Sequence, residues 1–71
     1  MKFMILLHKH VLYEHLGDVM TPGVEVVECA PEELGELVFM ISVNMIPEIA
    51  EANGVERKNV NIVPHQIVVL P

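Results

Sequence analysis

Three histidines lie within eight positions near the start of the chain, in the stretch LLHKHVLYEH, residues 6 to 15. Imidazole nitrogens are common ligands of transition metals, and histidine also exchanges protons near neutral pH. His8 and His10 would point to the same side of a strand that continued beyond the first apolar run, and His15 or Glu14 could add a third ligand. The spacing therefore predicts a candidate metal site at His8, His10 and His15.

Two other interpretations of these residues stay open. Strong metal signatures contain two closely spaced ligand couples, and here His65 is the only remaining histidine and Cys29 the only cysteine. The three histidines are then solvated residues at the point where a buried strand comes out into water. A third interpretation is contact with a ligand or acid–base chemistry, which needs a side chain within hydrogen-bonding reach of a substrate. The candidate ligand-binding residues are His8, His10, Asn44 and His65.

No motif for nucleotide binding or hydrolysis is present: the chain lacks a Walker loop, G-x-G-x-x-G, G-x-S-x-G and H-E-x-x-H. Cys29 follows Glu25 and Glu28 closely, and acidic neighbours disfavour the thiolate that a nucleophile needs. The sequence therefore favours a non-enzymatic protein without a cofactor.

The chain has 71 residues, and 52% of them are hydrophobic. A single domain of this size, residues 1 to 71, removes only about 60% of its unfolded surface from water. Its interior has too little room for so much apolar material. Part of that material should lie against a second copy or another protein, so we expect a homodimer.

Ten acidic and four basic residues give a formal net charge of −6, which disfavours binding to nucleic acid. The longest apolar run, residues 37 to 43, is far shorter than the ~18 residues that a membrane span needs. Charged and polar residues interrupt the N-terminal run too early for a secretory signal. A lone cysteine fits a reducing compartment, so we expect a cytoplasmic protein, in the host cytoplasm if it is viral.

The first half of the chain predicts two strands. Residues 3 to 7 are apolar on both faces, as in a central strand that is covered on each side. The spacing in residues 10 to 16 favours a short helical turn, and the turn signal TPG precedes a second strand at residues 24 to 29. A helix should begin near Pro31, because proline suits a first helical turn.

The second half is more ambiguous. Residues 37 to 43 fit either a helical stripe or a buried third strand, and we favour the strand. Asn44 could then cap a helix that ends at Asn53 and Gly54, and Pro64 would lie in a closing hairpin or an edge bulge, of which we favour the hairpin. The expected fold is α+β: a small single-domain mixed β-sheet of four to five strands with two or three helices packed against it.

The stretches VEVVECAPEELGELVFMISV and NGVERKNVNIVPHQIVVL, within residues 24 to 70, resemble a shortened form of the type III anti-CRISPR ring nucleases, a small viral family. The resemblance is nearly literal at residues 54 to 56 and 59 to 60. It implies a homodimer that binds a cyclic oligoadenylate between its subunits, with a Gly-His pair after the third strand supplying the catalytic histidine. This chain has Val43 and Asn44 at that place, so no catalytic residue is assigned.

These observations together predict a small acidic, non-catalytic homodimer that binds another protein, such as a phage or viral accessory protein or inhibitor. The alternative is a ligand-binding or hydrolytic protein. It would take a cyclic oligonucleotide at the dimer interface or a metal at the histidines.

Overall fold

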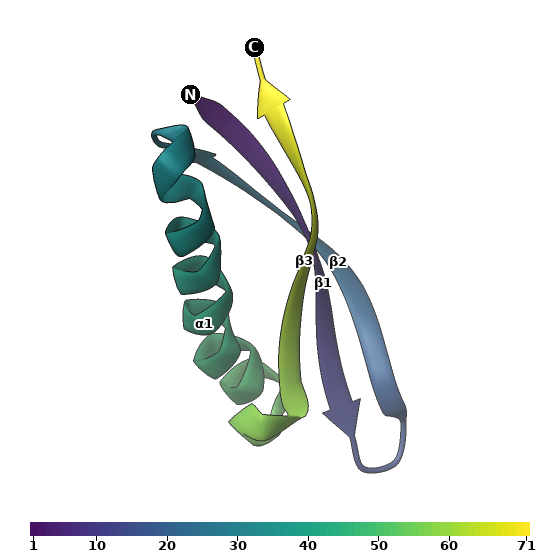
Figure 1. Ribbon diagram of the computed structural model, residues 1–71. Helices are drawn as coiled ribbons and strands as arrows, with labels where there is room; N and C mark the ends of the chain where they lie inside the picture. The colour runs from purple at the N-terminus through teal and green to yellow at the C-terminus, as the bar shows by residue number, and fades with distance from the viewer.

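The computed structural model describes residues 1 to 71 and consists of one antiparallel sheet with a single long helix along one side (Figure 1). The elements follow the order β1 (Lys2–Tyr13), β2 (Gly17–Glu28), α1 (Leu34–Asn53) and β3 (Val60–Leu70). Short 3-10 turns at Pro31–Glu33 and Arg57–Asn59 precede α1 and β3. The molecule is elongated, with principal extents of 42 × 16 × 15 Å.

Strand β1 lies in the centre of the sheet, whose order is β2-β1-β3. It pairs with β2 from Lys2 opposite Glu28 to Tyr13 opposite Gly17, so the two strands form a long hairpin. Gly17 re-enters the sheet after the three-residue turn with a φ of 73°, a left-handed conformation that glycine adopts without a steric cost. The hairpin therefore fixes the register of the sheet before the helix begins.

The sheet has one covered and one uncovered side, and burial along β1 alternates accordingly. Its odd-numbered residues Phe3, Ile5, Leu7 and Val11 are buried, whereas the even-numbered residues between them are half-buried or exposed. Figure 1 shows α1 running along one side of the strands, with no element on the other side. The hydrophobic core lies between the sheet and the helix and consists of Ile5, Leu7, Ala50, Val60 and Ile62.

Helix α1 covers the sheet with one stripe of side chains at helical spacing. The half-buried residues that pack on the core include Leu34, Val38, Ile41, Met45 and Ile49. The Glu33 carboxylate accepts a 3.3 Å hydrogen bond from the N–H of Ala30 just before the helix, and Gly54 ends it with a φ of 64°. The expected starting region near Pro31 and the expected end at Asn53 and Gly54 are both confirmed.

The expected number of elements is wrong. The sheet has three strands, not four to five, and one α-helix packs against it, not two or three. Residues 10 to 16 do not form a helical turn, because β1 continues to Tyr13 and pairs with β2 along its whole length. The broader class, α+β, holds.

Residues 37 to 43 are helical, and the third strand expected there is wrong. The apolar side chains of residues 37 to 43 fit the spacing of a strand and that of a helix. The helical spacing, however, continues through the twenty residues of α1, whereas the strand spacing is limited to the short run. Asn44 consequently lies inside α1 and does not cap it. Packing of the whole helical stripe against the sheet therefore favours the helix over the strand at residues 37 to 43.

The prediction of a closing hairpin is also wrong, because β3 continues through Pro64 as one strand. Leu6 pairs with Gln66 and Leu7 pairs with Pro64, so His65 is an extra residue in a β-bulge. A proline has no N–H to donate, and a bulge in an edge strand accommodates that loss without ending the strand. The edge bulge, the other option for Pro64, is what the chain forms.

Candidate functional site

The side of the sheet that α1 leaves uncovered is the most prominent surface of the molecule, and we call it the open face. Residues that pair across antiparallel strands point to the same side, so the even-numbered residues of β1 define it together with their partners. Between its two ends, the open face contains Met4, Leu6, His8, His10 and Leu12 of β1, Asp18, Met20, Pro22, Val24 and Val26 of β2, and Asn61, Val63, His65, Gln66 and Val68 of β3.

Much of the open face is apolar and in contact with water. Val24 and Val26 are 57% and 56% exposed, and Met20, Leu12 and Val63 are exposed as well. Only seven of the 71 residues are buried in the whole chain. Contiguous apolar surfaces of this kind mark interaction sites in soluble proteins.

Charged side chains lie only at the two ends of this surface. Lys2 and Glu28 lie opposite each other in the strand register at one end, and Asp18 lies near the other. The remaining acidic residues lie in turns, on α1 or on the helix side of β2. The centre of the open face is therefore free of permanent charge, whereas the rest of the molecule is acidic.

Three histidines gather at the middle of the open face, and we call them the histidine cluster: His8, His10 and His65. The rings of His8 and His65 are stacked with their centroids 4.0 Å apart and an interplanar angle of 30°. The rings of His8 and His10 meet edge to face at 6.3 Å. The expectation that His8 and His10 share one side of a continuing strand is confirmed.

Each member of the cluster is placed by the backbone. The bulge brings the extra residue His65 of β3 onto the ring of His8. His10 lies opposite Met20 on β2, and its Nδ1 atom is 3.0 Å from Oδ2 of Asp18. The His10 ring is thus oriented by a carboxylate, which leaves its Nε2 atom free, whereas His8 and His65 make no hydrogen bond within the chain.

The other predicted site residues lie apart from this cluster. His15 lies in the turn between β1 and β2, and Asn44 lies on α1, which covers the opposite side of the sheet. The fold does not bring three or more histidine, cysteine or acidic side chains into an arrangement that could hold a metal within one chain. Metal binding by His8, His10 and His15 stays a prediction, and the structure adds His65 as the ring that contacts His8.

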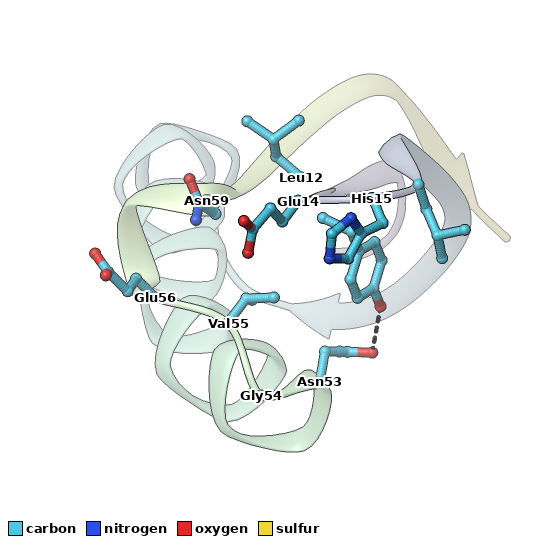
Figure 2. A pocket seen from close by; sticks show the side chains of 10 residues that line it. Leu12, Glu14, His15, Asn53, Gly54, Val55, Glu56 and Asn59 are labelled. Carbon is cyan, nitrogen blue, oxygen red and sulfur yellow. Dashed lines mark hydrogen bonds between the residues drawn. The ribbon is translucent and has the colours of Figure 1, made fainter.

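A second feature is an open cavity of about 450 Å³ at the end of the molecule where the hairpin turn meets the end of α1 (Figure 2). Glu14 and His15 extend into it from the turn, and Glu56 lies at its margin. The hydroxyl of Tyr13 donates a 2.8 Å hydrogen bond to Oδ1 of Asn53 beside it. The cavity is shallow and combines two carboxylates with one imidazole, without an arrangement typical of catalysis.

Comparisons with protein-family models, curated proteins and solved structures find no match to this chain. The resemblance to the ring nucleases relied in part on a third strand at residues 37 to 43 and a closing hairpin. The structure has a helix and a single strand at these places, so it gives that resemblance no support. No helix of the fold combines the length and the hydropathy needed to cross a membrane.

The open face as a whole was missed in the sequence, although its signal was present. Residues 3 to 7 were expected to be covered on both sides because both faces are apolar. Val24 and Val26 alternate with Glu25 and are the exposed residues of that pattern. An apolar residue on the uncovered side of a strand looks the same in sequence as one that is buried.

Proposed function

We propose that this chain is a non-catalytic interaction protein that works as a homodimer, in which the open faces of two copies pack against each other. The observation that carries the proposal is the uncovered apolar side of the sheet. Strand residues such as Val24, Val26 and Met20 expose to water the kind of side chains that a second layer would cover. A domain normally covers such a face with a second layer, and none of the elements from β1 to β3 covers this one.

The size of the open face supports a second copy as the occupant. The molecule measures 42 Å by 16 Å in its two longest dimensions, so the open face projects to at most roughly 670 Å², of the same order as the ~800 Å² of accessible surface per partner in a standard interface. A two-fold pair uses the same patch on both subunits. The occupant then has the same length, width and apolar character as the surface that it covers.

The distribution of charge supports the same arrangement. Two acidic molecules repel each other, and this chain carries a net charge of −6. The open face is where the repulsion is weakest, because its centre has no permanent charge and the acids are found mainly elsewhere. Burying this face removes little charge from water, whereas burying the outer side of α1 would bring Glu36, Glu48 and Glu51 close to another acidic chain.

The dimer would expose an acidic outer surface, which fits a second, basic protein as its binding partner. Cys29 is a free thiol, which suits a reducing cytoplasm as the place of action. Neither the end cavity nor the histidine cluster supplies a nucleophile with an adjacent base, so the proposal includes no catalysis.

The test is the mass of the protein in solution, measured by sedimentation equilibrium between 1 and 100 µM. The wild type should sediment as a dimer, and the double variant Val24→Lys, Val26→Lys should be a monomer of unchanged circular dichroism. The matched control is Phe39→Lys, Val43→Lys on α1, two apolar residues that are 67% and 45% exposed. The control should remain dimeric. A monomeric wild type, or dissociation by the control alone, would overturn the proposal.

A further inference from the structure

The histidine cluster lies near the centre of the surface that the proposed dimer buries. His8 is the seventh of the twelve residues of β1, the central strand, so it is close to the midpoint of the open face in both directions. A two-fold axis through the interface brings the midpoint of one face onto the midpoint of the other. The histidine clusters of the two copies therefore meet near the axis.

We propose that His8 and His65 of two copies form one shared site for a divalent transition metal such as Zn²⁺, and that the metal strengthens the dimer. This inference rests on the proposed dimer. One chain supplies only two adjacent imidazoles that make no hydrogen bond within the chain, which agrees with the absence of a metal arrangement within a single chain. Two chains supply four, the number of ligands in a closed tetrahedral zinc site.

The geometry of the pair is compatible with chelation after a small side-chain movement. Nitrogen ligands bind zinc at about 2.0–2.1 Å, which places two ligating atoms at roughly 3.3 Å from each other. The centroids of the stacked rings of His8 and His65 are 4.0 Å apart, in the range from which rotation of the side chains can turn both rings toward one ion. His65 is exposed in the bulge, so its ring can turn away from the ring of His8 without displacing a buried side chain.

Other groups around the pair favour a cation and do not compete for it. His10 is 6.3 Å from His8, and its Nδ1 atom is occupied by Asp18. A carboxylate behind an imidazole is the arrangement that commonly orients a metal-ligating histidine, so His10 is available as an additional ligand. Lys2 is the only permanent cation on the open face, and it lies at its far end.

The experiment is a titration of the tag-free wild type with ZnCl₂ at pH 7.5. Isothermal titration calorimetry measures zinc binding, and sedimentation equilibrium measures dimerisation. We expect one zinc ion per dimer. The dimer dissociation constant should fall about a hundredfold when free zinc is 100 times its own dissociation constant, because the metal binds only the dimer. Absorption spectroscopy of the Co²⁺-loaded dimer should show a tetrahedral site.

The double variant His8→Phe, His65→Asn should lose the response to zinc: its dimer dissociation constant, measured first without zinc, should not change when zinc is added. His15→Asn, a change of one exposed histidine outside the cluster, is the matched control and should keep the full response. If the wild type dimerises without zinc and its dimer dissociation constant does not change when zinc is added, the shared site is overturned while the proposed dimer stands. Binding of one zinc ion per chain without a change in dimerisation has the same meaning. A wild type that is monomeric with and without zinc overturns both.

Discussion

The hydroxyl of Tyr13, the last residue of β1, donates a 2.8 Å hydrogen bond to Oδ1 of Asn53, the last residue of α1. Asn53 in turn donates from Nδ2 to the carbonyl of Ile49 one turn earlier, at 2.8 Å. One side chain therefore joins the tip of the long hairpin to the end of the helix (Figure 2). The contact connects residues forty positions apart in sequence.

Removing this hydroxyl should weaken the whole fold modestly. Tyr13→Phe keeps the aromatic ring and deletes one hydrogen bond, so it should lower the free energy of unfolding by about 0.5–1.5 kcal/mol. Urea denaturation followed by circular dichroism measures the loss. In a double-mutant cycle with Asn53→Ala, the two losses should be less than additive, since both changes delete the same bond. Full additivity would show that the hydrogen bond contributes nothing to stability.

The sequence was a good guide where one local cause decides the structure. Gly54 ends the helix because only glycine takes a left-handed φ without cost, and the expected end was confirmed. Pro31 marks the start of the helical region for a similarly local reason. The apolar run of residues 3 to 7 predicts a strand, and these residues lie in β1.

The sequence was a poor guide where the outcome depends on a distant partner. Residues 10 to 13 have helical spacing, yet they are strand because β2 pairs with every one of them. His65 contacts His8 because of a bulge in β3, where the local sequence favours a hairpin turn over a bulge. The pairing register and the bulge depend on two strands together. The sequence of either strand alone therefore could not predict which histidines lie in the cluster.

The conformation of two glycines at opposite ends of α1 provides a further test of the fold. Gly54→Ala places a side chain on a residue with a φ of 64° and should destabilise the protein by ~1 kcal/mol, although no atom lies within 4 Å of the new Cβ. Gly35→Ala is the matched control, because Gly35 lies in the first turn of α1 without a positive φ and its new Cβ also meets nothing. The control should stabilise by about 0.5–1 kcal/mol, since alanine favours the helix.

Thermal unfolding of both variants at equal concentration measures these changes. Opposite signs at the two sites are the expected result. Equal effects would contradict a left-handed Gly54 beside a helical Gly35, since the space around both added methyl groups is open.

Substitutions of two neighbouring leucines distinguish the contribution of the core to stability from the contribution of the dimer. Leu7 is buried against α1, whereas Leu6 points to the open face. Leu7→Ala should cost about 2–5 kcal/mol at every protein concentration, because it leaves a cavity within one chain. Such a loss is large for a chain with seven buried residues, so it should be measured in a stabilising osmolyte.

Leu6→Ala should behave differently if two open faces pack together. Its cost should be small at a concentration well below the dimer dissociation constant, where the protein is monomeric, and should grow at a concentration well above it, because binding of a second copy adds stability by mass action. Denaturation curves of both variants at the two concentrations measure this difference. A cost of Leu6→Ala that does not change with concentration would mean that this leucine stabilises only the monomer, and the open face would then need a different occupant.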